Sequence, residues 1–574
     1  MHLLLSILTA LTVLSVPKDK VGTPVLFGSR IVDVNRPHGK VFAPGQRNPR
    51  PQVMLFQRQD SCLVLVPELP PRGRRMRVGP VIFPIVEETA DAFSIALEPY
   101  FSTYPEDISA IPPRMLPGPA VEHRLECPST PPEWMQVNGR YRYQDGLEVT
   151  AACYFLWLRE KPLPPVDLDL TKVGYNFVEG RHPEGRFLRW DLTGGRKLDF
   201  YVDKAFPEEW YPYIQEGIED WNQAFRAVGL GDVLAVHPEP EGLDTTSPLV
   251  NMVRYMDVEE SNAKGDVLID PRSGEILQGD ILWWKNVVDL LEGWRYVQTG
   301  AADPAARQED YPMEMLGPMI RHAVCHEMGH VLGLSHNMGA SWAFPADSLR
   351  DAAFTRRYGT TASVMDYARY NHLATAADVQ AGVALLPPRL GPYDYYAIAC
   401  GYGPDPHLEP GPYCSFAPMI SAAIPPDPSA QPESLGDDLL RSSRTGADNC
   451  RALLALDGLT PGRQALLKKS YYRYLSLALS NIGGITREVP VTRKVRRKTL
   501  AFVMDALAHV PSQLKDPSQE QVILDELVGN FLPERLVKTV GRKELDNYYR
   551  HLRHLRKKYP ELPLKPSEQW KYNN

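Results

Sequence analysis

The chain has 574 residues, which allows about three or four domains, each with a core of its own. With 43% hydrophobic and 23% charged residues, its composition excludes an extensively disordered protein. The 63 basic and 70 acidic residues leave a formal charge of −7, which disfavours nucleic acids and anionic lipids as partners. We therefore expect a folded protein that does not bind nucleic acid.

An apolar run of 15 residues, His2 to Val16, opens the sequence and ends at Pro17. The run is shorter than the roughly 20 residues that a membrane-spanning helix needs, so we expect no transmembrane span. Its length suits the apolar part of a secretory signal peptide, although no Lys or Arg precedes it and no A-x-A cleavage site follows it. Residues 1–20 are therefore either a signal peptide or the first strand of the first domain.

Residues 21–172 have the pattern of a β-rich accessory domain. Short runs of β-branched and aromatic residues at Cys62–Val66, Ala92–Leu97 and Leu147–Leu158 alternate with segments rich in Pro, Gly and Arg. Runs of this length between turn residues are typical of strands. The first domain is therefore expected to consist mainly of a β-sheet.

Residues 173–403 combine strand and helix patterns. Strands are expected at 197–202, 250–255 and 276–283, and Pro207 opens a long amphipathic helix between the first two. The apolar stripe of that helix consists of Trp210, Ile214, Ile218, Trp221 and Phe225. This order predicts a sheet accompanied by helices.

The last third of the chain differs again. Nine prolines crowd residues 404–438, a density that predicts a linker or an extended surface segment. Residues 439–574 are mostly helical in pattern. The fold class predicted for the whole chain is therefore α+β, with an N-terminal β-rich domain and a C-terminal helical region.

The residues that carry chemistry lie in a second helix, expected over Pro318–Leu332 with its proline in the first turn. The sequence HEMGHVLGLSHN begins near its end, at His326. Residues four apart lie on one helix face, about 6 Å from each other, so His326 and His330 can share one cation. Gly333 suits the turn that must end the helix, and His336 can then arrive from the loop as a third nitrogen.

Three neutral imidazoles with an open fourth position predict a catalytic zinc site, with one zinc ion per chain. Glu327 lies about 100° around the helix from His326, too far to be a ligand but close enough to hydrogen-bond a water on the metal. It is the predicted general base. Cys325 points about 100° away from the zinc face and is interpreted as packing. The alternative for the whole motif is a helix with surface or core histidines and a glycine cap.

A second element, Ser363–Tyr367, begins 27 residues beyond His336. Together with HExxHxxGxxH, it resembles the metzincin signature with its Met-turn. The resemblance implies that Met365 forms a hydrophobic floor beneath the three histidines. It also implies a catalytic role for Tyr367, which would approach the zinc or hydrogen-bond the reaction intermediate.

Four segments narrow the resemblance: Asp347–Leu349, Ser363–Asn371, Leu390–Asp394 and Asn481–Gly484. They are similar to segments of a bacterial family of zinc-dependent metalloproteases with a Met-zincin catalytic domain. The similarity runs from about residue 173 to at least residue 516 and is looser upstream. Because that family is commonly exported, the resemblance implies a secreted or periplasmic protein.

These observations predict a zinc-dependent metalloendopeptidase of the metzincin type, whose partner is a protein or peptide substrate. Its catalytic domain is expected over residues 173–403, with strand 276–283 as the sheet edge that pairs with an extended substrate. One alternative is a catalytically inert binding protein with the same fold, which the intact Glu327 disfavours. The other is a zinc amidase on non-protein substrates, which would share every metal residue.

A calcium site is a further hypothesis. Asp266, Asp270 and Asp280 lie near glycines, as in some acidic loops that hold Ca²⁺. Their spacing fits no EF-hand, so turn chemistry is the favoured interpretation of these carboxylates.

Overall fold

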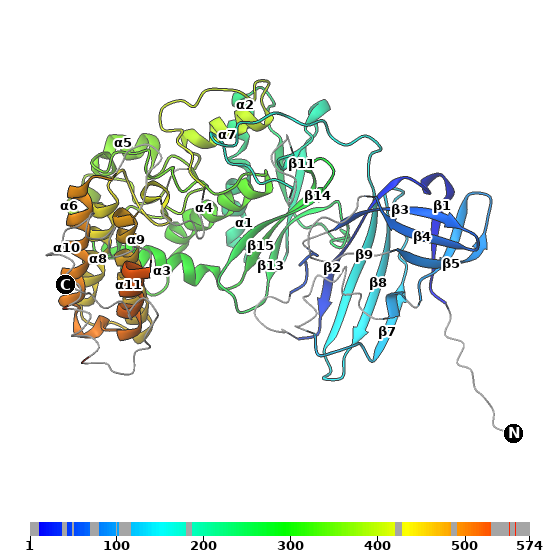
Figure 1. Ribbon diagram of the computed structural model, residues 1–574, viewed down its shortest axis with the longest axis horizontal. Helices are drawn as coiled ribbons and strands as arrows, with labels where there is room; N and C mark the ends of the chain where they lie inside the picture. The colour runs from blue at the N-terminus through cyan, green and yellow to red at the C-terminus, as the bar shows by residue number, and fades with distance from the viewer. Residues whose placement is uncertain are drawn as a thin grey trace, which may run out of the picture.

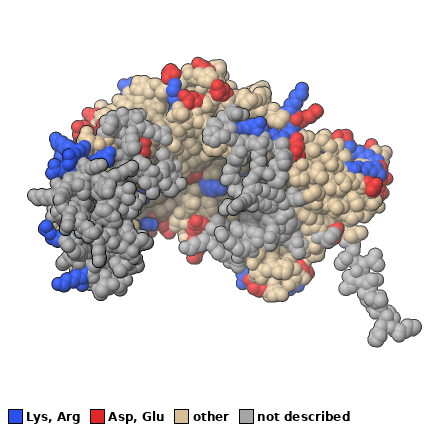
Figure 2. Space-filling view, viewed as in Figure 1, with Lys and Arg blue, Asp and Glu red and all other residues tan. Residues whose placement is uncertain are grey.

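The computed structural model describes residues 11–36, 43–48, 51–68, 80–98, 100–102, 116–178, 186–387, 389–418, 427–483 and 491–529, together with Arg550 and Lys557. The fold is mixed α+β (Figure 1). An N-terminal antiparallel sheet lies at one end of the molecule, a mostly parallel sheet in the middle and a set of helices at the other end. The face between the two ends is hollowed (Figure 2).

The N-terminal sheet has nine described strands in the order β1-β6-β5-β4-β3-β2-β9-β8-β7. All neighbouring strands are antiparallel, which agrees with the β-rich domain expected from the sequence. The strands are β1 (Val13–Pro17), β2 (Pro24–Val34), β3 (Gln52–Gln59), β4 (Cys62–Pro67), β5 (Val81–Glu88), β6 (Ala92–Ala96), β7 (Glu122–Glu126), β8 (Trp134–Arg142) and β9 (Glu148–Trp157).

The end of the N-terminal apolar run is a strand. Val13–Pro17 pairs with Ala92–Ala96 of β6, and Val16 is fully buried. The start of the run, residues 1–10, lies outside the described residues. Among the helices that the structure describes, none is both long and apolar enough to cross a membrane.

The second sheet has the order β10-β15-β13-β11-β12, and β14 also pairs with β15. The β14–β15 pair is antiparallel and all the others are parallel. The strands expected at 197–202, 250–255 and 276–283 are confirmed as β11, β13 and β15. The bounds are β10 (Arg189–Trp190), β11 (Leu198–Val202), β12 (Leu234–Pro238), β13 (Asn251–Met256), β14 (Ala263–Asp270) and β15 (Glu275–Trp284).

The expectation that strand 276–283 is a sheet edge is wrong. Asp280 of β15 pairs with Met252 of β13 and with Asp266 of β14, so both sides of β15 are occupied. Nearly every residue of β15 is buried, as expected of an interior strand covered on both faces. Among the described strands, β14 pairs only with β15 and is therefore an edge strand, as are β10 and β12.

The helices are α1 (Tyr211–Glu219), α2 (Asn222–Ala227), α3 (Val287–Thr299), α4 (Met313–Val331), α5 (Ala352–Tyr358), α6 (Ala376–Gln380), α7 (Pro392–Tyr402), α8 (Leu439–Leu454), α9 (Pro461–Gly483), α10 (Arg493–Ala508) and α11 (Pro517–Gly529). The described residues between 439 and 529 are thus largely helical, as expected for the C-terminal region. Residues 530–574, apart from Arg550 and Lys557, lie outside the described residues.

Two helices differ from their predicted bounds. The helix expected from Pro207 is divided into α1 and α2, because the N–H of Trp221 bonds to the carbonyl three residues back, at Ile218, and tightens the chain there. Its apolar stripe is still buried from Ile214 onward. Helix α4 begins at Met313, so Pro318 stands in its second turn rather than its first.

The proline-rich segment 404–438 is packed against the rest of the chain where it is described. The backbone N–H of Ala417 donates to the side-chain oxygen of Asn337, and the Asn337 amide donates to the carbonyl of Ser415. Further along, Ala430 and Leu435 are buried. These contacts differ from a free linker, and they place the segment directly beside the histidine motif.

Candidate metal centre

Helix α4 carries the first two histidines and is fixed by side chains that bind its last carbonyls. The indole N–H groups of Trp221 and Trp190 donate to the carbonyls of Cys325 and Val331, each at 2.9 Å. The Val331 carbonyl belongs to the last turn of the helix, where intrahelical partners run out, and the Cys325 carbonyl lies in the turn that precedes the histidines. The helix end that bears His326 and His330 is thereby held between the sheet and α2.

The turn after α4 depends on Gly333. Its φ is +95°, and a Cβ at this position would collide with the carbonyl oxygen of Leu188. Directly after it, Leu334 forms a β-bridge with Tyr175, and the N–H of Ser335 donates to the carbonyl of Gly174. The reversal predicted at Gly333 is therefore present, and it delivers His336 to the helix face.

The structure brings the three predicted histidines together. One ligand atom from each of His326, His330 and His336 lies within 4.8 Å of the others. The His330 and His336 Nε2 atoms are 3.2 Å apart. Within the part of the chain that the structure describes, this is the only cluster of three or more His, Cys, Asp or Glu side chains close enough to hold a metal ion.

Two backbone carbonyls orient the imidazoles. Nδ1 of His326 lies 2.7 Å from the carbonyl oxygen of Val364, and Nδ1 of His330 lies 2.9 Å from that of Leu334. A hydrogen on each Nδ1 donates to the carbonyl, so each Nε2 keeps its lone pair for a cation. This arrangement fits a metal held through three Nε2 atoms.

The electrostatics of the cluster favour neutral imidazoles. Burial, reinforced by the neighbouring histidines, holds the pKa of His326 well below its usual range and lowers that of His336 to about 3. Metal ligation requires the unprotonated ring. The three-histidine cluster is therefore consistent with zinc binding.

Glu327 lies beside the cluster with one oxygen fixed. Its Oε2 accepts a hydrogen bond from the backbone N–H of Gly265 in β14, at 2.7 Å. The residue is 9% exposed, and burial raises the pKa of its carboxyl group. Sequence reasoning missed Gly265, whose contact with Glu327 spans 62 residues of chain.

The predicted Met-turn lies beneath the histidines. Met365 is fully buried, and its Sδ is in such close contact with α4 that a Cβ on Gly329 would collide with it. The turn is held by Asp394, whose Oδ2 accepts from the N–H of Val364 at 2.8 Å. Val364 is also the acceptor for His326, so Asp394 supports a ligand through the backbone.

Asp394 was visible in the sequence only as part of the segment Leu390–Asp394. Its other oxygen accepts from the hydroxyl of Ser363 at 2.6 Å, and Oδ2 accepts also from the N–H of Gly391. The carboxyl group is fully buried. A spacing argument could not have joined Asp394 to the histidines of α4, because it follows His330 by 64 positions in the chain.

Tyr367 lies against two of the histidines. Its ring centroid is 4.6 Å from that of His336 and 5.7 Å from that of His326. The ring is also covered by the guanidinium of Arg369, 4.5 Å from its centroid. The tyrosine is therefore close enough to the cluster to reach a group held there, and its catalytic role stays a prediction.

Cys325 packs as interpreted from the sequence. It is 1% exposed, and its Sγ lies 3.8 Å from the carbonyl oxygen of Arg389 rather than among the histidines. All seven cysteines of the chain are described, and each is unpaired.

The calcium hypothesis is wrong, because cations of the protein already neutralise the three carboxylates. Asp270 pairs with Arg272 at 2.8 Å. Asp266 pairs with Arg47 at 3.0 Å and with Lys264 at 2.9 Å. Asp280 pairs with arginines from three parts of the chain, Arg30, Arg47 and Arg254. Only Asp270, which also accepts from the N–H of Arg272, shows the turn chemistry that the sequence favoured.

Comparison with known proteins agrees with this geometry. Residues 308–514 match the family model described as Met-zincin, and this part of the chain is a Met-zincin domain. The match begins shortly before α4 and ends after α10, so it contains all three histidines, Glu327 and the Met-turn. No curated protein and no solved structure matches the chain.

Proposed function

We propose that this protein is a zinc-dependent endopeptidase. The observation that carries the proposal is the placement of Glu327 beside three imidazoles whose Nε2 atoms converge. A structural zinc site is closed by four protein ligands, whereas three nitrogens leave a position for water or substrate. A buried carboxylate next to that position favours a hydrolytic role for the metal site over a structural one.

When bound, zinc would supply Lewis-acid polarisation of a peptide carbonyl and lower the pKa of a water. Glu327 Oε2 is held by Gly265, which leaves the carboxylate oriented to accept the proton of an attacking water. The same carboxyl group then returns that proton to the departing amine.

The substrate backbone is proposed to pair with β14. This strand is an edge strand of the second sheet among the described strands, and Gly265 places it directly beside Glu327. Addition of an extended peptide to a sheet edge holds it by main-chain hydrogen bonds. We thus propose β14, rather than β15, as the strand that pairs with the substrate.

A mixed peptide library, incubated with the zinc-loaded wild-type protein and with Glu327→Ala, tests the proposal. We expect internal cleavage by the wild type only, abolished by a chelator. An inert binding protein would cleave nothing in either form. A zinc amidase would hydrolyse small non-peptide amides in a Glu327-dependent way and leave the peptides intact.

Export to the periplasm or the medium is a further proposal, supported only by the resemblance to an exported family. The seven unpaired cysteines mean that the fold does not depend on disulfide bonds. Cell fractionation with an antibody to the full chain tests it: we expect the protein outside the cytoplasm, and retention in the cytoplasm would contradict export.

A further inference from the structure

Arg369 is a cation beside the histidine cluster that stacks on aromatic rings but forms no ion pair or hydrogen bond in the described part of the chain. Its guanidinium carbon lies 3.1 Å from the ring centroid of Trp294 and 4.5 Å from that of Tyr367. Its Nε is buried and has no hydrogen-bond partner, and no carboxylate among the described residues lies within ion-pair distance of the side chain. The rings fix the guanidinium without using its hydrogen-bond donors.

Other arginines near the site are paired. Arg321 of α4 forms ion pairs with Glu216 and Asp220, and Arg295 of α3 pairs with Asp303 at 3.0 Å. A desolvated charge costs free energy unless a partner compensates it. The open donors of Arg369 therefore call for an anion that arrives from outside.

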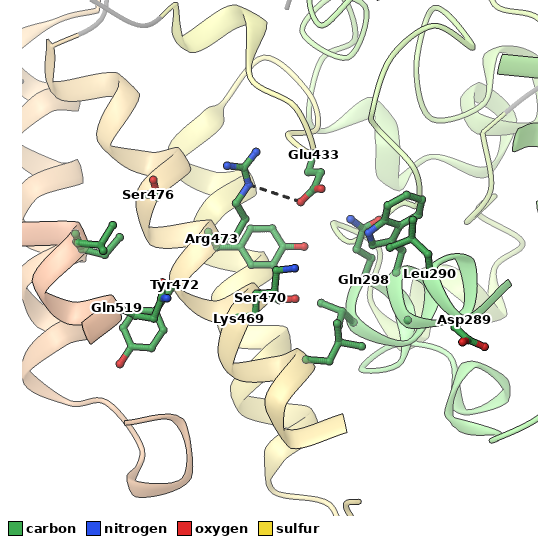
Figure 3. Close-up of a pocket in the computed structure, with 17 residues that line it drawn as sticks. Asp289, Leu290, Gln298, Glu433, Lys469, Ser470, Tyr472, Arg473, Ser476 and Gln519 are labelled. Atoms are coloured by element: carbon green, nitrogen blue, oxygen red, sulfur yellow. Dashed lines mark ion pairs between the residues drawn. The ribbon is translucent and has the colours of Figure 1, made fainter. Parts of the chain in front are cut away.

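Glu433 is the carboxylate whose charge acts most on Arg369, but no ion pair or hydrogen bond joins the two side chains. Glu433 lines a cavity of about 470 Å³ between α3 and α9, where Trp294 also forms part of the wall. Its Oε2 lies 3.9 Å from Nε of Arg473, as the dashed line in Figure 3 shows. Trp294 thus lies between Arg369 and this cavity.

Arg369 is within reach of a substrate held at the histidines. Its guanidinium covers Tyr367, and the ring of Tyr367 lies 4.6 Å from that of His336. The two contacts in series span at most about 9 Å, which an extended peptide covers in two or three residues at roughly 3.3–3.6 Å per residue. A group bound by Arg369 would therefore lie close to the scissile bond.

We propose that Arg369 binds a carboxylate of the substrate two or three residues from the scissile bond, and so makes the site selective for anionic peptides. The planar guanidinium matches a carboxylate through two parallel N–H···O bonds. The carboxylate comes either from the C-terminus of the peptide or from an acidic side chain. The inference rests on the proposed peptidase function for the position of the scissile bond.

Three N-acetylated peptides distinguish these sources. They share one sequence, taken from the cleaved library, that ends two residues past the scissile bond. The first has a free C-terminal carboxylate and the second a C-terminal amide. The third also has a C-terminal amide but carries Glu in place of the last residue. For the wild type we expect kcat/KM about tenfold or more higher for one of the two anionic peptides than for the neutral amide. Equal kcat/KM for all three would overturn the inference.

Arg369→Met and Arg369→Lys test whether this residue causes the preference. Arg369→Met should abolish it, mainly through a higher KM for the anionic peptide, with the neutral amide cleaved within a few-fold of wild type. Arg369→Lys should restore part of it, because the charge returns without the fork. A preference for anionic peptides that survives in Arg369→Met would contradict carboxylate binding. An equal loss of kcat on every peptide would also contradict it, and would mean that Arg369 only holds Tyr367 in place.

Arg463→Met is the matched control. Arg463 also stacks on a ring, 4.5 Å from the centroid of Tyr296, but it donates to the carbonyls of Arg307 and Gln308 and so has partners. It lies outside the histidine cluster. Its substitution should leave the preference for anionic peptides unchanged, and loss of the preference here would contradict the assignment to Arg369.

Calorimetric binding to zinc-loaded Glu327→Ala separates this inference from the peptidase proposal. We expect the preferred anionic peptide to bind about tenfold tighter than the neutral amide. Arg369→Met in the same Glu327→Ala background should remove this difference in affinity. Selective binding without any cleavage by the wild type would defeat the peptidase proposal alone. Cleavage without selective binding, or no binding of any of the three peptides, would defeat the Arg369 inference.

Discussion

The backbone N–H of Gly265 donates a hydrogen bond of 2.7 Å to Oε2 of Glu327. The edge strand β14 and helix α4 approach each other here as closely as glycine allows. A Cβ on Gly265 would lie 2.5 Å from the carbonyl oxygen of Glu327 and 2.7 Å from Cβ of His330. The strand proposed to hold the substrate therefore also orients the predicted general base.

Gly265→Ala should separate β14 from α4, because the new methyl group meets the carbonyl oxygen of Glu327 and the Cβ of His330, which both belong to the helix. We expect kcat to fall by about tenfold or more and stability to fall by about 1–3 kcal/mol, as for other overpacked sites. Gly411→Ala, where nothing lies within 4 Å of the added Cβ, is the control. Wild-type kcat for Gly265→Ala at full zinc occupancy would disprove this coupling.

Tyr367→Phe tests the role that the resemblance implies for the hydroxyl. A donor that engages only the developing oxyanion helps the transition state more than the bound substrate. We expect kcat to fall by about 10²–10³, with zinc content unchanged and KM within a few-fold. If steady-state kinetics instead give the wild-type kcat, Tyr367 is a packing residue.

Asp280→Ala should be among the most destabilising single substitutions in the chain. The carboxylate is fully buried and accepts from Arg30, Arg47 and Arg254, so its removal leaves three buried cations without their shared partner. Burial raises the pKa of Asp280, but the three arginines outweigh this effect and lower it to about 2, so the carboxyl group is ionised at neutral pH. Breaking a buried charge pair costs about 3–5 kcal/mol.

Urea unfolding, followed by tryptophan fluorescence, measures this loss. Asp145→Ala, which removes an exposed partner of Arg36, is the matched control and should leave the unfolding midpoint unchanged. Because Arg30 and Arg47 belong to the N-terminal region and Asp280 to β15, we also expect the two sheets to unfold less cooperatively in Asp280→Ala. Equal midpoints for the two variants would refute the importance of this cluster.

His372 should make stability depend on pH. It is 1% exposed, its Nδ1 has no hydrogen-bond partner, and burial lowers its pKa to about 4. Between that value and about 6.5, the unfolded chain binds more protons than the folded one, so stability is lost as pH falls through this window. One such group contributes up to about 1.4 kcal/mol per pH unit.

His372→Gln should be less stable than the wild type at pH 7 but lose less stability on acidification. The comparison is the free energy of unfolding at several pH values between 4.5 and 7, with both proteins zinc-loaded. His407→Gln, at an exposed position, controls for a general histidine effect. Parallel pH profiles for wild type and His372→Gln would rule out a lowered pKa at His372.

Local spacing accounts for what could be predicted from the sequence. His326 and His330 are four residues apart on a helix, and Gly333 marks the turn that returns His336, so each step depends on neighbours in the chain. The strands around 200, 253 and 280 were predicted for the same reason, because their patterns are periodic within a few residues.

Contacts between distant segments account for the rest. Gly265 and Asp394 reach the site through strand pairing and helix packing, which no spacing along the chain encodes. Asp280, one of the acidic residues considered for calcium, is balanced by Arg30, Arg47 and Arg254, two of which lie more than 200 residues away. The position of β15 inside its sheet likewise depends on β14, which was not predicted as a strand.

Zinc titration of the metal-free protein tests the central claim most directly. Peptide cleavage should rise linearly with added zinc and saturate at about one ion per chain, because His326, His330 and His336 form one site. His330→Ala should neither retain stoichiometric zinc by elemental analysis nor recover activity. Cleavage that does not depend on zinc, or the same stoichiometric zinc content in His330→Ala as in the wild type, would contradict the account.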